Sequence, residues 1–533
     1  MKEIQTRIVR SYLGMPLAAT AALLFAAAAP AEEVRQAWVR RYNGPGNGED
    51  NVTAMVVDAT GNVYLTGSSP GDGTRDDFAT IKYDSCGTRL WRARYTRSGD
   101  STDRPAALDV DSDGNVYVTG WSSTISDRKC VTISYDDAGH QRWVHPYDGP
   151  DELGSSGKAV TINGDGYIYV GGNVSREETG SDYLILKYDP AGNLLLDRTY
   201  IVPRSQGFVG IGVDQTGNIF AAGTSWTESS GTDWLTVMYD SAGVLKWADW
   251  YDGPASEEDG VMDMVVDGSG ICYVTGYSYG GLQITEYDYA TIKYNTLGQR
   301  EWVKRYNNDT LNKDDFPLAL ALHPSGNISV TGLSTTEVNG VCSGTTVTYD
   351  PDGTRVWVAW YNENRTARFV DVAVDIAGNT AVTGCGSPNN IRSLDYVTVK
   401  YDQTGQLLWD QYYDGPGEDY LALDTGLAVG FDAAGSVYVT GQSVGVDSDI
   451  DFATVKYCEG CEETQACCLW DGRCLDRPAP VCTAGDGTPQ GPGTECSVED
   501  YDHDGVVDTC DGCPYDPNRI EPDECGCGMP REP

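Results

Sequence analysis

The seven residues GNVYLTG, Gly61–Gly67, recur as near-copies along this chain of 533 residues. The copies GNVYVTG, GNIFAAG and GSVYVTG end at Gly120, Gly223 and Gly441. Aligning the chain with itself at a period of about 53 residues gives eight units, a repeat length typical of propellers and solenoids. The glycines that close the phrase are Gly67, Gly120, Gly172, Gly223, Gly276, Gly332, Gly384 and Gly441.

Each unit predicts four short β-strands. Examples of the four segments are ALDVD (Ala107–Asp111), the quoted phrase, DFATIKYD (Asp77–Asp84) and LWRARY (Leu90–Tyr95). Their β-branched and aromatic residues alternate between turn signals, which favours strands over helices.

Two tight turns per unit share the sequence Asp-x-x-Gly, as in Asp58–Gly61 and Asp84–Gly87. The aspartate carboxylate can accept backbone N–H bonds inside such a turn, and glycine takes the left-handed position that closes a short hairpin. Because both hairpins of a four-stranded unit fall at one end, the remaining loops and the connections between units fall at the other end.

The two ends of the repeat array complement each other. AWVRRY (Ala37–Tyr42) is a fourth strand without the first three, and the last unit stops after its third strand at Tyr457. The N-terminal strand can therefore complete the last unit and remove exposed sheet edges. The sequence predicts an all-β fold over residues 37–457, a closed β-propeller of eight four-stranded blades. An open solenoid and two smaller rings are the alternatives.

The pattern VVD-xx-GNVYVTG, D(Y/F)ATIKYD-xx-G and W-xxx-Y resembles the SBBP repeats of bacterial secreted β-propellers. The resemblance covers residues 37–457 and implies a secreted propeller. That family is named for seven blades, whereas this chain has eight units. The tryptophan of the pattern is replaced by Leu196 in the third unit.

Residues 1–31 have the pattern of a secretory signal peptide. Three basic residues precede the apolar stretch Leu13–Ala28, and Ala29–Ala31 fits cleavage after small residues. We therefore expect a secreted protein, which is extracellular, on the cell surface or periplasmic, with an uncleaved anchor as the alternative. No later segment resembles a membrane span, so we expect no transmembrane segment after cleavage.

The composition restricts the partners. The chain has 79 acidic and 37 basic residues, which gives a formal net charge of -42. This charge argues against nucleic acid or anionic lipid as a partner and favours cations or basic surfaces, although acidity also keeps secreted proteins soluble. No pattern in the sequence sets the oligomeric state.

Loops away from the Asp-x-x-Gly turns vary in length and sequence, and variable loops on a rigid scaffold commonly carry function. Two examples are GSSPGDGTRDD from Gly67 and GYSYGGLQITEYD from Gly276. We predict a face there that binds a protein or carbohydrate, suited to a basic partner, a cation or a stacked sugar ring. Solvated loops without a ligand are the alternative. The candidate residues are Asp72, Asp76, Asp77, Glu257, Glu258, Asp259, Asp447, Asp449, Trp121, Trp226, Tyr277 and Tyr279.

Two stretches, GSSPG (Gly67–Gly71) and GYSYG (Gly276–Gly280), match the nucleophile elbow of hydrolases. The serine recurs at the same place in six units and therefore belongs to the blade, so we predict no catalytic residue. The spacing D-xx-G-xxx-W is similar to the tryptophan-docking motif of quinoprotein propellers, in which the tryptophan packs between blades. A propeller enzyme, either a quinone-dependent oxidoreductase or a polysaccharide-acting enzyme, is the alternative to a binding protein.

The composition changes after the repeats. Eleven of the sixteen cysteines lie between Cys458 and Cys527, and so dense a set in a secreted chain predicts a disulfide-stapled module at residues 458–497. Zinc bound by the Cys-x-x-Cys pairs of the tail is the competing interpretation. Cys130 and Cys272 replace apolar residues of other units, so we expect both in the propeller core.

The tail segment 498–533 contains DYDHDGVVDTCD, Asp500–Asp511. Oxygens at alternate positions and a sharp turn at Gly505 favour a hard cation bound in a loop. Continued to Asn518, the stretch resembles a thrombospondin type 3 repeat, which implies calcium in a disulfide-braced loop. A solvated acidic linker is the alternative. The candidate calcium ligands are Asp500, Asp502, Asp504, Val506 through its carbonyl, Asp508 and Asp511.

Overall fold

The computed structural model describes residues 34–99, 101–201, 205–227, 231–255, 257–280, 286–308, 313–335, 342–361, 366–387, 394–417, 424–445, 449–459, 464–469, 474–478 and 487–489. The predicted signal peptide and the predicted calcium loop lie outside these ranges. All regular elements within the ranges are β-strands. No helix in the described residues has the length and apolar character needed to cross a membrane.

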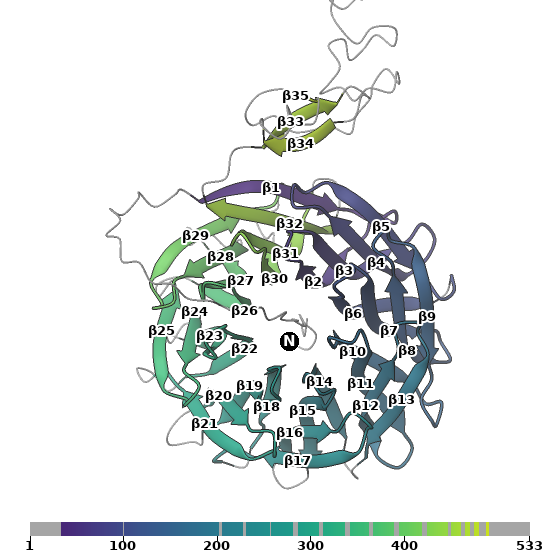
Figure 1. Cartoon of the computed structure of the whole chain (residues 1–533), viewed down its shortest axis with the longest axis vertical. Coiled ribbons are helices and arrows are strands. Elements are labelled where there is room, and N and C mark those ends of the chain that lie inside the picture. Colours follow the sequence, from purple (N-terminus) through teal and green to yellow (C-terminus); the bar gives the residue numbers. More distant parts are fainter. Residues whose placement is uncertain are drawn as a thin grey trace, which may run out of the picture. The chain divides into compact units, whose positions relative to one another are not determined.

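Eight four-stranded sheets form the blades of a β-propeller, with the first strand of each blade innermost (Figure 1). Blade 1 is β2 (Asn51–Val57), β3 (Val63–Pro70), β4 (Asp76–Tyr83) and β5 (Arg89–Tyr95). Blade 2 is β6 (Thr102–Val110), β7 (Val116–Ser123), β8 (Arg128–Tyr135) and β9 (Gln141–Tyr147). Blade 3 is β10 (Ser155–Ile162), β11 (Ile168–Arg176), β12 (Gly180–Tyr188) and β13 (Leu194–Tyr200). Blade 4 is β14 (Gln206–Val213), β15 (Ile219–Thr227), β16 (Gly231–Tyr239) and β17 (Leu245–Tyr251).

The other four blades have the same strand order. Blade 5 is β18 (Gly260–Val266), β19 (Cys272–Tyr279), β20 (Tyr287–Tyr294) and β21 (Arg300–Tyr306). Blade 6 is β22 (Asp315–Leu322), β23 (Ile328–Thr335), β24 (Cys342–Tyr349) and β25 (Arg355–Tyr361). Blade 7 is β26 (Ala367–Val374), β27 (Thr380–Gly386), β28 (Asp395–Tyr401) and β29 (Leu407–Tyr413). Blade 8 is β30 (Thr425–Phe431), β31 (Val437–Val444), β32 (Ile450–Glu459) and β1 (Val34–Tyr42). In the tail, β33 (Thr464–Leu469), β34 (Cys474–Pro478) and β35 (Gly487–Pro489) form a three-stranded sheet in the order β34-β33-β35.

The quoted phrase provides a turn glycine followed by the second strand of each blade. Gly61 has a φ of 86°, in the left-handed region that glycine adopts without strain. Asp58 Oδ1 accepts the backbone N–H groups of Thr60 and Asn62, each at 2.9 Å. The predicted turn chemistry is confirmed here.

The glycine that ends the phrase is required because the neighbouring strand approaches it closely. The first strand of blade 5 carries a bulge between Val261 and Asp263, and the carbonyl oxygen of Gly260 then lies where a Cβ of Gly276 would be. A glycine in a strand commonly marks such an approach. In the other blades a backbone carbonyl oxygen lies equally close to the Cβ position of the closing glycine. These glycines are Gly67, Gly120, Gly172, Gly223, Gly332, Gly384 and Gly441.

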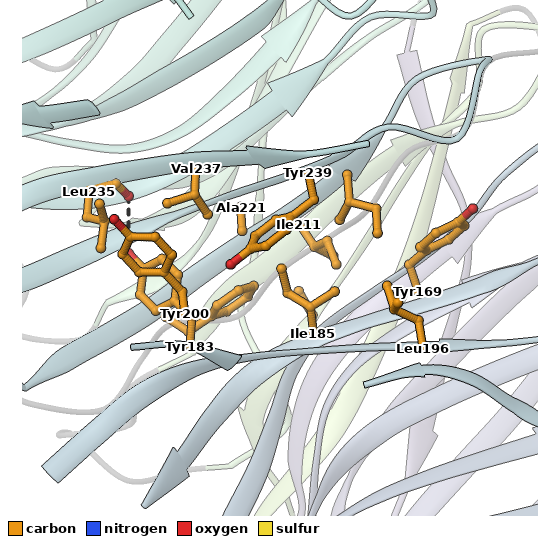
Figure 2. Close-up of a cluster of buried hydrophobic side chains, with 13 residues drawn as sticks. Tyr169, Tyr183, Ile185, Leu196, Tyr200, Ile211, Ala221, Leu235, Val237 and Tyr239 are labelled. Atoms are coloured by element: carbon orange, nitrogen blue, oxygen red, sulfur yellow. Dashed lines mark hydrogen bonds between the residues drawn. The ribbon is translucent and has the colours of Figure 1, made fainter. Parts of the chain in front are cut away.

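Apolar clusters fill the space between neighbouring blades. Figure 2 shows the cluster between blades 3 and 4, in which the Tyr183 hydroxyl donates to the Leu235 carbonyl at 3.1 Å. Leu196, which replaces the tryptophan of the sequence pattern, is buried in this cluster. Cys130 and Cys272 are fully buried in the equivalent clusters, as predicted.

The tryptophans of the pattern join one blade to the next. Trp91 of β5 donates its Nε1–H to the Asp137 carbonyl in a turn of blade 2 at 2.9 Å, and its ring covers Gly139 of that turn. Trp302 of β21 makes the same contact with the Pro351 carbonyl of blade 6 at 3.1 Å. The tryptophan therefore has the structural role expected from its spacing.

The last blade contacts the first, which closes the ring. The inner strands β30 and β31 contact β2. Gln442 Nε2 donates to Asn51 Oδ1 at 2.6 Å, and the Asp50 N–H donates to the Ile450 carbonyl at 2.6 Å. With β1 beside β32 in the eighth sheet, the predicted propeller of eight blades is confirmed, and a solenoid or two smaller rings are excluded.

Candidate functional site

The two ends of the propeller differ in the regularity of their connections. At one end, each described turn has the same five-residue form closed by a glycine at positive φ. The other end carries connections of unequal length, such as 71–75 between β3 and β4 and 280–286 between β19 and β20. It also carries the connections between blades, such as 252–259. We call it the loop-bearing end, and it is where a ligand can be recognised by residues that differ from blade to blade.

An arginine holds the loop-bearing end of blade 1 together. Arg94 Nη2 lies 2.9 Å from Asp77 Oδ2, and Nη1 donates to Ser69 Oγ at 2.7 Å and to the Tyr42 hydroxyl at 2.8 Å. Asp77 and Ser69 are both buried. Ser69, the serine of a hydrolase-like motif, therefore faces a guanidinium and not an imidazole base. Asp77, predicted as a ligand-binding carboxylate, belongs to this internal ion pair.

Two further blades repeat the arrangement. Arg305 Nη1 donates to Ser278 Oγ at 2.6 Å, and its Nη2 lies 2.7 Å from Asp288 Oδ2. Arg41 makes the same two contacts in blade 8, at 2.7 Å and 3.0 Å. In all three blades the arginine immediately precedes the tyrosine that ends the fourth strand. This Arg-Tyr pair is a sequence signal for the arrangement, but the sequence does not distinguish it from an arginine on a solvated face.

A second buried carboxylate lies at the start of the first strand, or directly before it, at several blade connections. Asp315 Oδ2 accepts the Asn308 N–H at 2.8 Å, and Asp424 Oδ2 accepts the Gly415 N–H at 2.7 Å. Burial raises the pKa of Asp315 to about 7, despite the N–H bond that favours its charged form. The carboxylates at this position are Asp50, Asp103, Asp259, Asp315 and Asp424.

The raised pKa of Asp315 predicts a pH dependence of stability. In the unfolded chain this carboxyl titrates near pH 4, so between about pH 4 and pH 7 only the folded state holds the proton. Its contribution is therefore fully present below pH 4 and is lost as the pH rises to about 7. We expect the Asp315→Asn variant to gain stability relative to the wild type over this interval, by at most about 4 kcal/mol. Urea unfolding of both proteins at pH 4.5 and pH 8 measures this, and an unchanged difference contradicts it.

Three carboxylates meet where blade 4 connects to blade 5. One oxygen from each of Asp233, Asp252 and Asp259 lies within 4.8 Å of the others. Asp233 and Asp259 are buried, and Asp252 is exposed. Across the described ranges, this is the one group of three or more metal-ligating side chains that is so compact. Of its members, only Asp259 was a candidate from the sequence, because strand residue Asp233 and loop residue Asp252 show no spacing signal.

Four aromatic side chains lie beside these carboxylates. Asp259 Oδ1 accepts the backbone N–H of Tyr279 at 3.0 Å. The rings of Tyr277, Tyr279 and Phe316 each lie 5.4 Å from the ring of Tyr287. All four residues are half-buried, so the group keeps part of its surface open to solvent. We call them the aromatic cluster.

The other predicted loop residues have different surroundings. Trp226 is 50% exposed, whereas the Arg128 guanidinium covers Trp121 at 4.2 Å from the ring centre. Asp76 is paired with Arg104 at 2.8 Å. The exposed carboxylates are Asp72, Glu257, Glu258 and Asp449. The predicted residues outside the described ranges are Asp447, Asp500, Asp502, Asp504, Val506, Asp508 and Asp511.

Comparison with known families supports the repeat assignment over part of the chain. Residues 90–124 match the SBBP family, described as a beta-propeller repeat. The match extends from β5 through β6 and β7, so it includes one copy of the quoted phrase. No curated protein matches the chain.

Three solved structures that resemble the chain have low sequence identity to it. A protein of unknown function from Bacteroides caccae is 14% identical, with 55% of this chain and 93% of that chain covered and a TM-score of 0.33. The polysaccharide lyase Uly1 is 10% identical, with 77% and 90% covered and a TM-score of 0.41. Drosophila Plexin A in complex with Semaphorin 1b is 9% identical, with 80% and 88% covered and a TM-score of 0.38. At these values the similarities carry no argument about function.

Proposed function

We propose that this chain is a secreted, non-catalytic binding protein that recognises a carbohydrate at its loop-bearing end. The observation that carries the proposal is the aromatic cluster, whose half-buried residues lie next to the exposed carboxylate of Glu258. The propeller supports an interaction or scaffold face, because its closed ring of blades holds the loops in fixed positions.

Carbohydrate is the ligand chemistry that fits these groups. Aromatic faces stack on the apolar faces of sugar rings, and carboxylates accept hydrogen bonds from sugar hydroxyls. Glu258 is exposed beside the cluster, and its charge contributes to raising the pKa of Tyr287, after the larger effect of burial. The net charge of -42 disfavours anionic polysaccharides. Neutral polysaccharides are therefore the preferred class.

The prediction for this site is a loss of binding without a loss of fold. Tyr287→Ala removes the ring that contacts the other three members of the cluster, and we expect at least a tenfold weaker affinity for a neutral polysaccharide. Affinity electrophoresis in gels containing xylan, galactomannan or soluble starch measures the retardation. The matched control is Tyr167→Ala, which changes a half-buried tyrosine at the opposite end of the propeller. Equal retardation of the wild type and Tyr287→Ala in every gel, or no retardation of the wild type in any gel, contradicts the proposal.

The tail adds a second element to the proposal, calcium bound by the loop Asp500–Asp511. Its support is the spacing of oxygen-bearing residues around Gly505, the arrangement that calcium loops use. Calcium bound there stiffens a segment with few apolar residues. We expect the Asp504→Asn variant to bind one calcium ion fewer than the wild type in a calorimetric titration at millimolar calcium, the range of extracellular modules. An unchanged number of bound ions contradicts this part of the proposal.

A further inference from the structure

At the loop-bearing end, the same three strand positions come together in every connection between blades. Each junction brings together the start of a third strand, the end of the following fourth strand and the start of the next first strand. In junction 5/6, between blades 5 and 6, these positions hold Asp288, Arg305 and Asp315. Two carboxylates and one guanidinium leave a net charge of about -1 if both acids are ionised. Junctions 8/1 and 1/2 have the same composition, with Arg41 and Arg94 as their cations.

In other junctions the arginine position and the acid positions change together, so that the acids are still matched by cations or are absent with them. In junction 2/3, Lys129 stands at the start of the third strand and pairs with Asp148 at 2.8 Å. In junction 6/7, Trp360 stands at the arginine position, and Ser343 and Ala367 stand where both acids would be. The loss of the arginine is therefore accompanied by the loss of the acids.

In junction 4/5 the acids are not matched by a cation from the arginine position. Trp250 stands at the arginine position, yet Asp233 and Asp259 are retained. A third acid, Asp252, follows the tyrosine that ends the fourth strand, where junction 5/6 has Asn307. Three carboxylates with one divalent cation restore the net charge of about -1 that the arginine junctions have.

A buried hydroxyl lies at the place that the arginine occupies in other junctions. Ser225 is 0% exposed, and its Oγ has no hydrogen-bond partner among the described residues. It pairs with Asp233 in the same register as Ser278 pairs with Asp288 in blade 5. Since Ser278 Oγ accepts a hydrogen bond from an arginine, the equivalent Ser225 Oγ faces the place where that cation would lie. An oxygen there suits a hard metal ion as well as a guanidinium.

Junction 7/8 repeats the same combination. Tyr412 stands at the arginine position, and the acids are Asp395, Asp414 and Asp424. Asp395 is 5% exposed, and within the described part of the chain its Oδ1 has no hydrogen-bond partner. Asp424 accepts backbone N–H groups on both oxygens, from Gly415 at 2.7 Å and from Val444 at 2.9 Å. A third acid thus occurs again where the arginine is absent and both of the usual acids remain.

From these observations we propose that a calcium ion occupies junction 4/5, bound by Asp233, Asp252 and Asp259. Calcium takes six to eight oxygen ligands at 2.3–2.6 Å, so two of its ligands lie at most about 5 Å apart. The spacing of 4.8 Å or less in junction 4/5 meets that limit. The exposed Asp252 gives the ion a route from solvent, and water completes the coordination. The ion joins carboxylates of blade 4 and of the connection to blade 5, and the site does not depend on the proposed carbohydrate function.

The test uses the full chain with Asp502→Asn and Asp504→Asn. These substitutions remove the proposed tail site, so that it no longer adds to the number of bound calcium ions. Calorimetric titration with calcium chloride then reports the propeller sites alone. Adding Asp252→Asn, a change at an exposed position, is expected to reduce the number of bound calcium ions by one. The matched control Asp148→Asn removes the acid from junction 2/3 and is expected to leave the number unchanged.

A second variant replaces the metal with a protein cation. Trp250→Arg places a guanidinium in junction 4/5 and is expected both to bind one calcium ion fewer and to show a smaller loss of Tm on addition of EDTA. Trp360→Arg, in the junction without acids, is the control and keeps the wild-type calcium response. No calcium binding in the tail-substituted chain, or the same number of bound ions with and without Asp252, overturns the proposal. The number of calcium ions bound by the tail loop is measured separately, by comparing titrations of the chain with and without the tail substitutions.

Discussion

The Arg94→Ala variant is expected to unfold with a free energy about 3–5 kcal/mol lower than the wild type. The substitution leaves Asp77 buried without its guanidinium, and it removes donors from Ser69 and Tyr42. Among the described residues, Asp77 then keeps the hydrogen bond from the Thr74 hydroxyl at 3.0 Å, which does not neutralise its charge. Breaking one side of a buried ion pair costs far more than removing an exposed pair, because the remaining charge cannot be hydrated.

Urea unfolding followed by tryptophan fluorescence measures this difference. The matched control is Arg104→Ala, which breaks a pair with Asp76 at 2.8 Å in which the arginine is 47% exposed. Solvent screens that pair, so the expected cost is about 1 kcal/mol or less. Equal effects of the two substitutions would show that Arg94 is not a structural element of the loop-bearing end.

Trp234→Ala is the second substitution with a large expected effect, again about 3–5 kcal/mol. Trp234 is 0% exposed in the cluster between blades 4 and 5, with its ring centre 5.2 Å from that of Tyr251. Its Nε1–H donates to the Tyr277 carbonyl at 3.4 Å. The cavity left by the ring lies between two blades and next to Tyr277 of the aromatic cluster. Carbohydrate affinity is therefore expected to fall together with stability.

The control for this substitution is Trp226→Ala, since Trp226 belongs to the same blade but is 50% exposed. An exposed side chain leaves no cavity, and the expected change in unfolding free energy is within about 0.5 kcal/mol. Thermal unfolding followed by circular dichroism compares the two. A loss at Trp226 as large as that at Trp234 would contradict the assignment of core and surface in blade 4.

The blades could be predicted from the sequence because their signals are local. The turn from Asp58 to Gly61 carries its own hydrogen bonds, and the alternation of the quoted phrase sets its strand. Ring closure could also be predicted, because the first strand and the incomplete last unit complement each other. The exact repetition of the closing glycine has a cause that the sequence did not reveal, namely the bulge in the neighbouring strand that leaves no room for a Cβ.

The charges of the loop-bearing end could not be predicted, because they depend on contacts between segments that are distant in the sequence. Asp259 was expected as a ligand-binding residue, but its partners Asp233 and Asp252 come from other strands and connections. The contacts of Asp109 could not be predicted for the same reason. Asp109 was assigned to an apolar strand, but its carboxylate accepts the Ile162 N–H of the next blade at 3.1 Å, and burial raises its pKa to about 8.

Hydrogen exchange tests most directly whether the ligand binds at the loop-bearing end. The full chain is exchanged with and without the polysaccharide that retards it most strongly, and amide protection is compared between the two ends of blade 5. Binding at the aromatic cluster predicts slower exchange in residues 257–260 and 286–289, with no change in the turn at residues 295–299. Protection confined to residues 295–299 and to the equivalent turns of other blades would contradict the claim, because it would place the ligand at the opposite end of the propeller.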